Sequence, residues 1–172
     1  MTTEIIRLLN TLSSGLKAKQ LINQFAYGSF GDFDRVLNRT YPLMYVEYPT
    51  SYGRVVGTQI DKYQVGITLL DQPKSVGEHA TDRDLAALKT RLELSWAVFW
   101  NACKLHNQSD IPTLTTGRVY VNVGEGYNAI EVDLTQGDGV YGYRYEIAVH
   151  AGLSGCDLEQ LMDTITNLCL PQ

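Results

Sequence analysis

The chain has 172 residues, of which 44% are hydrophobic and 19% are charged, a balance that fits one folded domain with a substantial core. Its formal net charge is -5 and no basic stretch stands out, which argues against a protein that reads nucleic-acid sequence directly. No apolar run is long enough to cross a membrane, and the first residues do not resemble a signal peptide.

The first forty residues are expected to be mainly helical. Residues 3–16 carry apolar side chains at three- and four-residue intervals, which predicts an amphipathic helix. A second amphipathic stretch follows over residues 21–25, and Gly28 and Gly31 then break the pattern. We therefore expect residues 1–40 to form a helical N-terminal extension.

A β-hairpin is expected next. Residues 41–48 begin with a Tyr-Pro pair, which disfavours helix, and their apolar side chains then alternate between two faces. The stretch from Pro49 to Gly53 predicts a turn. Alternation returns within residues 54–70, so the two flanking stretches are predicted to pair as antiparallel strands.

The longest predicted element is a helix over residues 81–106, around which the other elements are arranged. Its apolar residues recur every three or four positions and form a wide stripe: Leu85, Leu88, Leu92, Trp96, Phe99 and Cys103. Thr81 and the two aspartates that follow it favour a helix start, because they can meet unsatisfied backbone N–H groups there.

Three further strands follow a polar loop. Residues 119–123, 130–134 and 141–149 each alternate in character, which predicts strands. The glycine-rich stretch 124–126 predicts a hairpin turn between the first two of them. A last amphipathic stretch predicts a C-terminal helical tail over residues 156–172.

Together these elements predict a single α+β domain over residues 1–172. It would contain a mostly antiparallel β-sheet of about five strands, with the long central helix and the terminal helices packed on it.

Motifs for catalysis or cofactor binding are not visible. The histidines and the three cysteines lack zinc-site spacing, and there is no phosphate-binding loop or serine elbow. Cys103 lies on the apolar stripe, where a buried, unreactive thiol is a better interpretation than a nucleophile. Glu131 and Asp133 share one strand face, which more often indicates a solvated face or a subunit contact than acid–base chemistry. His150, at a strand end, is expected to lie at the surface or to form hydrogen bonds. We expect no metal, no cofactor and no enzymatic activity.

Eleven tyrosines against four phenylalanines are the most unusual feature of the composition. Tyrosine has an apolar body and a polar end, and it is enriched where proteins meet. Most of the tyrosines fall on predicted strands or their turns, and strand propensity accounts for only part of them. The remainder indicate a surface that other chains cover, and thus favour an assembly protein over an enzyme.

Three stretches of the chain occur in an order found in a known family: the strand Tyr41–Val46, the helix over residues 81–103 and the closing hairpin over residues 127–149. This layout resembles tailed-bacteriophage neck and tail-completion proteins, especially the tail-terminator type. The resemblance implies a structural virion protein, made in the host cytoplasm, that forms part of the phage neck or tail as a tail terminator or head–tail joining protein.

The resemblance also implies partners. The chain would form a homo-oligomeric ring, expected to be a hexamer, with other phage neck and tail proteins above and below it and the genome passing through. Subunit contacts are expected from the last strand and its neighbour: Tyr141, Tyr143, Arg144, Glu146, Glu131 and Asp133. The alternatives from other classes are a small cytosolic enzyme and a ligand-binding module with a tyrosine-lined pocket.

Overall fold

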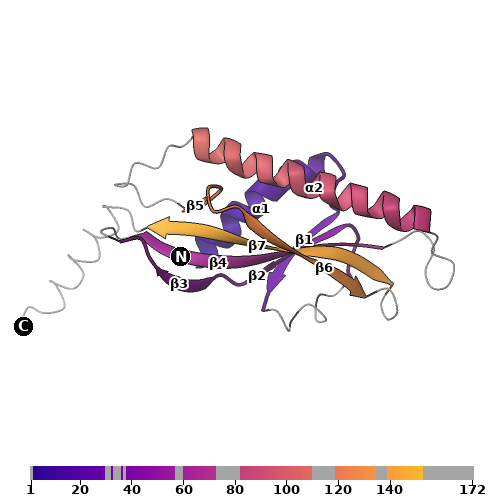
Figure 1. Cartoon of the computed structure of the whole chain (residues 1–172), viewed down its shortest axis with the longest axis horizontal. Helices are drawn as coiled ribbons and strands as arrows, with labels where there is room; N and C mark the ends of the chain where they lie inside the picture. Colours follow the sequence, from indigo (N-terminus) through magenta and orange to yellow (C-terminus); the bar gives the residue numbers. More distant parts are fainter. Residues whose placement is uncertain are drawn as a thin grey trace, which may run out of the picture.

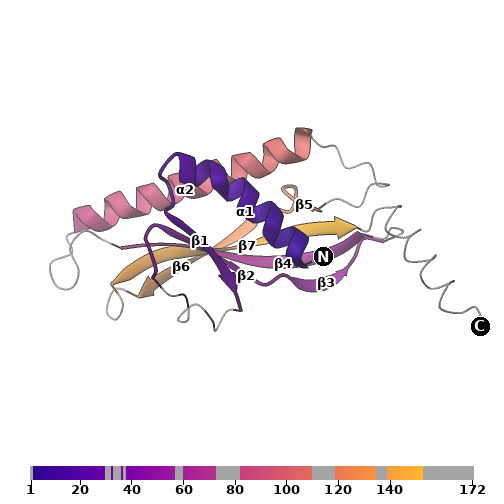
Figure 2. The same ribbon diagram turned by 180° about the vertical axis from the view of Figure 1, so that it is seen from behind.

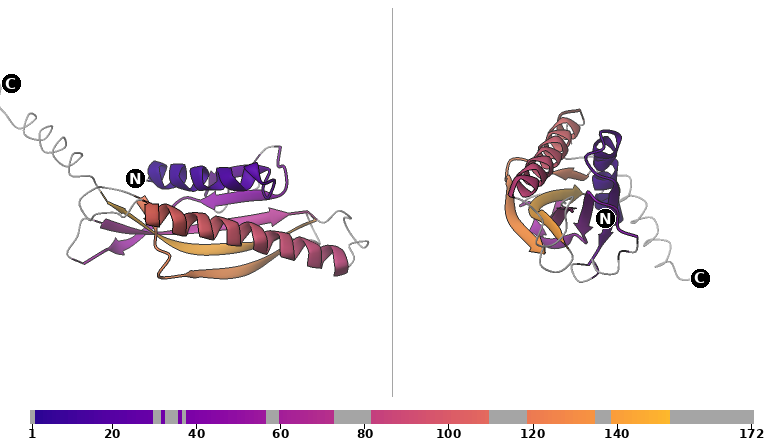
Figure 3. Two further views of the ribbon diagram at one scale, coloured as in Figure 1. Left: turned by 90° about the horizontal axis from the view of Figure 1, so that it is seen from above. Right: turned by 90° about the vertical axis from the view of Figure 1, so that its right-hand side faces the viewer.

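The computed structural model describes residues 2–29, 32, 36, 38–56, 60–72, 82–109, 119–134 and 139–152. Within these ranges the chain forms two helices and a seven-stranded mixed sheet. The elements in chain order are α1 (Thr2–Ala18), β1 (Gln24–Gly28), β2 (Leu43–Glu47), β3 (Thr50–Arg54), β4 (Ile60–Asp71), α2 (Asp82–Ser109), β5 (Val119–Val121), β6 (Tyr127–Leu134) and β7 (Val140–Gly152). Both helices lie side by side on one face of the sheet (Figures 1 and 3), so the predicted α+β class is confirmed.

The centre of the sheet is the antiparallel pair of β4 and β7, whose register runs from Ile60 opposite Gly152 to Asp71 opposite Tyr141. On the outer side of β4, β2 pairs with one half of the strand and β3 with the other. On the outer side of β7, β6 and β5 divide that strand in the same way. β1 adds to β2 in parallel at one side of the sheet (Figure 2).

The N-terminal region differs from the predicted helical extension. The first predicted helix is present as α1, which ends at Ala18 and is followed by Gln20 with a positive φ of 56°. The second amphipathic stretch is not a helix, because Phe25 lies on β1 and pairs with Met44 of β2. Pairing with a neighbouring strand outweighs the weak local preference for helix here.

Two predicted connections also differ from the structure, and one of them, together with β1, gives the sheet more strands than expected. Residues 50–54 form β3, which runs along β4 with a register shift between Ser51 and Gly53. The stretch 124–126 does not join a hairpin, because β5 and β6 both pair with β7 rather than with each other. β7 is 13 residues long, so it has room for two short partners in succession. The predicted pairing of β2 with β4 is confirmed.

The core lies between the helices and the face of the sheet beneath them. The predicted stripe of α2 is buried there at Leu88, Leu92, Trp96, Phe99 and Cys103. Alternate residues of the two central strands meet it: Val65, Ile67 and Leu69 from β4, and Tyr145, Ile147 and Val149 from β7. The opposite face has no helix over it among the described residues (Figure 3), so we call the two sides the covered face and the open face. The predicted tail over residues 156–172 lies outside the described residues.

Candidate assembly surfaces

A polar cluster lies at the rim of the covered face, where β6 and β7 approach α2. The Tyr141 hydroxyl donates to Oε1 of Glu131 at 2.6 Å and lies 3.3 Å from the Tyr143 hydroxyl. Lys89 of α2 joins the cluster, with its Nζ 3.2 Å from Glu131 Oε1 and 4.9 Å from the centre of the Tyr141 ring. Burial and the hydrogen bond to Glu131 raise the pKa of Tyr141, so its hydroxyl remains a donor.

An aromatic group beside this cluster attaches α2 to the sheet. Trp96 stacks on Tyr145 of β7, with ring centroids 3.7 Å apart and an interplanar angle of 2°. Tyr127 of β6 meets the edges of both rings at centroid distances of 5.0 and 5.7 Å, and Trp100 extends the group. Tyr127 is nevertheless 44% exposed, because it lies at the outer rim of this packing.

The open face carries a network of ion pairs around the middle of β7. Arg144 of β7 donates from Nε to Glu47 Oε1 at 2.6 Å and from Nη2 to Glu47 Oε2 at 2.9 Å. Its Nη1 also donates to Glu146, and Gln64 donates to the other oxygen of Glu146 at 3.1 Å. The hydrogen bonds to Glu47 raise the pKa of Arg144. Such a two-pronged contact fixes orientation as well as charge.

Glycine at position 66 makes this network possible. Gly66 lies on β4 opposite Glu146, on the strand that separates Glu47 from Arg144. A Cβ atom at position 66 would overlap the carboxylate of Glu47. The missing side chain therefore lets the ion pair cross over the central strand.

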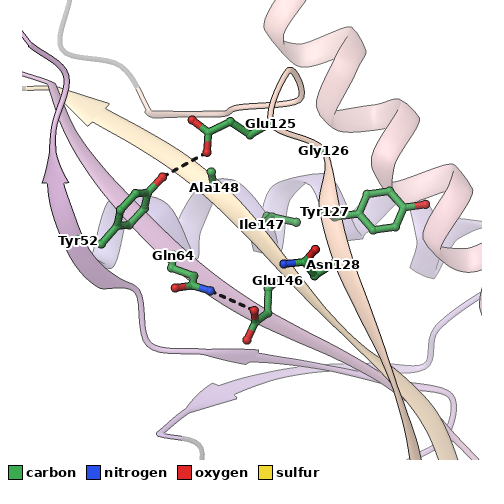
Figure 4. Close-up of a pocket in the computed structure, with 9 residues that line it drawn as sticks. All are labelled: Tyr52, Gln64, Glu125, Gly126, Tyr127, Asn128, Glu146, Ile147 and Ala148. Atoms are coloured by element: carbon green, nitrogen blue, oxygen red, sulfur yellow. Dashed lines mark hydrogen bonds between the residues drawn. The ribbon is translucent and has the colours of Figure 1, made fainter.

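An open concavity of about 250 Å³ lies on the same face, between β3, β4, β7 and the start of β6 (Figure 4). Tyr52 and Glu125 approach each other across it, with the tyrosine hydroxyl donating to Glu125 Oε2 at 3.4 Å. Figure 4 shows the ring of Tyr127 directed away from the concavity, toward the helix. Tyr52 is thus the one tyrosine ring that faces it within the described part of the chain. Its residues are Tyr52, Gln64, Glu125, Gly126, Tyr127, Asn128, Glu146, Ile147 and Ala148.

His150 lies close to the concavity but is buried. Its Nδ1 is 2.9 Å from the Tyr120 hydroxyl, and its Nε2 is 3.4 Å from Asn122 Nδ2 and 3.8 Å from Glu125 Oε1. Burial lowers the pKa of His150, Glu125 partly opposes that shift, and Lys62 adds to it. The sequence-based expectation of a hydrogen-bonded histidine is therefore confirmed.

Chemical machinery is scarce in the described ranges. Burial raises the pKa of the Cys103 thiol to about 12, so this cysteine stays protonated near neutral pH and is a poor nucleophile. Among the described residues, no group of three or more histidine, cysteine and acidic side chains is placed to hold a metal ion. Neither α1 nor α2 is long and apolar enough to cross a membrane. Cys156 and Cys169 lie outside the described residues.

The six residues predicted for subunit contacts do not form one surface. Tyr141, Tyr143 and Glu131 lie together on the covered face. Arg144 and Glu146 lie on the open face, where both are engaged within the chain. Asp133 is opposite Tyr141 in the register of β6 and β7, and its side chain lies outside the described part of the structure. Arg144, one of the six, forms its two-pronged contact with Glu47 of its own chain.

Sequence reasoning missed several exposed apolar residues that are available for contacts. Tyr27 and Tyr48 are 55% and 48% exposed and lie edge to face, with ring centroids 6.1 Å apart. Tyr27 was hidden by the helical interpretation of its region. Ile130 was expected to belong to an ordinary apolar strand row, but it is 51% exposed on the open face of β6. The high tyrosine count was the one available signal for such a surface.

Comparison with protein-family models and with curated protein sequences finds no match for this chain.

Proposed function

We propose that this protein is a structural subunit of a phage neck or tail, acting in a homo-oligomeric ring as a tail terminator or head–tail joining protein. The virion setting rests on the resemblance of the strand Tyr41–Val46, the long helix and the closing hairpin to that family. The net charge of -5 agrees with it, since a ring that encloses passing DNA should not hold its phosphates.

One observation supports assembly most directly: four tyrosines on or beside the strands are roughly half exposed. They are Tyr27, Tyr48, Tyr52 and Tyr127. Large aromatic side chains at the surface are characteristic of protein interfaces, where they contribute a disproportionate share of the binding energy. They lie at both sides of the sheet, as expected for a subunit that contacts one neighbouring subunit on each side.

The enzyme alternative has little support from the described residues. Cys103 is inaccessible, because its side chain is buried between its own helix α2 and the sheet. Glu131 accepts a hydrogen bond from Tyr141 and pairs with Lys89, which is a structural arrangement rather than a pair of carboxylates poised for proton transfer.

A ligand-binding module remains the second candidate, and the open concavity favours it. Its volume of about 250 Å³ lies below the range of about 300–1,000 Å³ usual for small-molecule sites, and it is lined by polar groups that already contact one another. This candidate predicts a stable monomer whose melting temperature rises when a small polar ligand binds.

Solution mass separates these candidates. Light scattering on a sizing column, over a series of protein concentrations, should reveal a ring-sized species, either for the chain alone or after addition of virion neck and tail proteins. A chain that stays monomeric under both conditions, and whose melting temperature responds to a small ligand, would replace the ring proposal with the binding module.

A further inference from the structure

The outer strands of the sheet differ in how well their edges are protected from further pairing. An exposed strand edge offers backbone N–H and C=O groups to another chain, and proteins usually block it with shortness, bulges, charges or proline. β5 has only three residues, and β3 contains the bulge at Ser51 and Gly53. β1 and β6 lack both forms of protection, since their registers with β2 and β7 are continuous.

β6 is the longer of these open edges. It pairs with β7 over eight residues, and within the described ranges no strand lies on its outer side. Its residues 127–131 are all exposed, including Ile130. An isoleucine that is half exposed beside an open edge provides both hydrogen-bonding backbone and apolar surface to a neighbouring strand.

β1 forms the opposite edge of the same sheet and is chemically different. Its sequence Gln24–Gly28 contains no charged residue and no proline, and no described strand lies on its outer side. Phe25 packs against the core and its ring lies 6.5 Å from that of the exposed Tyr27, which places both rings on the covered face. Edge pairing with β6 would therefore bring these rings alongside Tyr127, which is also on the covered face.

From these edges we infer that β1 of one copy pairs with β6 of the next copy, so that the sheet continues from subunit to subunit. This inference rests on the proposed ring and identifies its joining surfaces. The two strands run in opposite directions within the sheet, as the chain of pairings from β1 through β2, β4 and β7 to β6 requires. If a rotation that leaves the strand direction unchanged relates neighbouring copies, β1 of one copy and β6 of the next are antiparallel. A junction between two different edges can then be repeated from copy to copy until a ring closes.

Charge disfavours the simplest competing arrangement, in which two copies of β6 pair with each other. β6 contains Glu131 and Asp133 and no basic residue. In a two-fold antiparallel pair of β6 strands, an odd-numbered residue lies opposite an odd-numbered residue of the other copy. In the registers with most overlap, Glu131 is therefore opposite or diagonal to Glu131 of the other copy. Like charges placed this way are destabilising, whereas the uncharged β1 avoids the clash.

Covalent cross-linking tests the junction. Ala26 and Ile130 both lie on the open face of their strands, and a chain with Cys156→Ser and Cys169→Ser provides the background, because Cys103 is buried. The doubly substituted chain, Ala26→Cys with Ile130→Cys, should form a ladder of covalent oligomers with a short bismaleimide, ending at the mass seen by light scattering. Leu105→Cys with Ile130→Cys is the matched control, since Leu105 is exposed on α2 and belongs to neither edge strand.

Each outcome has a distinct meaning. A ring that assembles but cross-links no better through Ala26 and Ile130 than through the control pair would overturn this junction and leave the proposed ring intact. Covalent dimers from Ile130→Cys alone would replace it with a two-fold β6 contact. If the unsubstituted chain stays monomeric alone and with virion proteins, the proposed function fails, and the inference with it.

A charge substitution provides a second test that does not depend on linker reach. Ile130→Lys should raise the concentration needed for assembly by about tenfold or more, because it places a charged, hydrated side chain at the joining edge. Leu94→Lys is the matched control on α2, with a starting exposure of 53% against 51% for Ile130. Equal effects of the two substitutions would contradict a special role for β6.

Discussion

In the middle of β7 the two faces of the sheet are held by different interactions, although they share the same strand. On the covered face, β7 presents Tyr145, Ile147 and Val149 to the helices, and burial of apolar and aromatic surface dominates. On the open face, the intervening residues Arg144 and Glu146 form ion pairs and hydrogen bonds. One strand therefore separates two kinds of interaction by the alternation of its side chains alone.

This difference indicates where the fold can tolerate change. Apolar packing on the covered face has little tolerance for a change of volume, whereas polar contacts on a partly solvated face contribute less and depend on their partners. Assembly surfaces are thus expected at the edges and on the open side, where exposed residues can change without loss of the core. The predictions below test that ranking, beginning with the covered face.

Trp96→Ala should have the largest effect on stability. Trp96 is 3% exposed and stacks on Tyr145, so its removal should lower the free energy of unfolding by about 3–5 kcal/mol, the range found for large aromatic residues in cores. Urea denaturation followed by circular dichroism measures the loss. Leu94→Ala, on the exposed side of the same helix, should cost no more than about 0.5 kcal/mol. Similar losses for the two variants would contradict the assigned faces.

Gly142→Ala should have the next largest effect, at the centre of the sheet. A Cβ atom at position 142 would overlap the backbone carbonyl oxygen of Leu69, and backbone in the middle of a sheet cannot move aside as a flexible side chain can. We expect a loss of about 3 kcal/mol, at the upper end for overpacking. Gly124→Ala is the control, since the nearest atom beyond the adjoining residues, Asn122 Oδ1, would lie 3.4 Å from the added Cβ atom. A shift of the denaturation midpoint in the control equal to that of Gly142→Ala would refute the steric explanation.

Arg144→Met should have a smaller effect, because the ion pair on the open face is only partly buried. Side-chain exposures of 20% for Arg144 and 13% for Glu47 lead us to expect about 1–2 kcal/mol, less than for breaking a wholly buried pair. Glu47→Gln in the same chain should recover part of the loss, and the double-mutant cycle measures the coupling. Strict additivity of the two changes would show that the pair contributes no coupling energy. Loss of assembly with unchanged stability would instead return Arg144 to the subunit contact first expected from the sequence.

The strong periodic signals of the sequence predicted the central parts of the fold. The apolar stripe from Leu88 to Cys103 predicts a helix at least as long as the stripe, and the structure has that helix as α2. The alternation within β7 predicts two different faces, and the structure has these as well. Periodic patterns could not predict the strands β1 and β3 or the arrangement of β5 and β6. Each is a short segment whose conformation depends on an available edge of β2, β4 or β7, and such edges exist only once the sheet has formed.

The candidate surfaces were harder to predict than the fold, for a related reason. Alternation predicts that Glu131 and Ile130 lie on opposite faces, but it does not say which face a helix covers. In the structure the acidic residue faces α2, through Lys89, and the isoleucine is exposed. The partner of Arg144 was equally hard to predict. Glu47 of β2 contacts Arg144 of β7 across the intervening strand β4, where Gly66 leaves room for its carboxylate.

The pH dependence contributed by His150 should be the smallest of these effects. Its pKa in the folded protein lies below the ordinary value of 6.5, so over the interval between the two values the unfolded chain binds more protons than the folded chain. The free energy of unfolding should therefore fall as the pH drops from 6.5 toward the lowered pKa, and the contribution should be constant above this interval. We predict that His150→Gln, compared with the unsubstituted chain at about pH 7.5 and about pH 5.5, will lose less stability on acidification. Comparing the two chains at each pH cancels the titration of all other groups, which are common to both. An identical loss in the two chains would show that Tyr120, Asn122 and Glu125 accommodate the charged imidazole as readily as the neutral one.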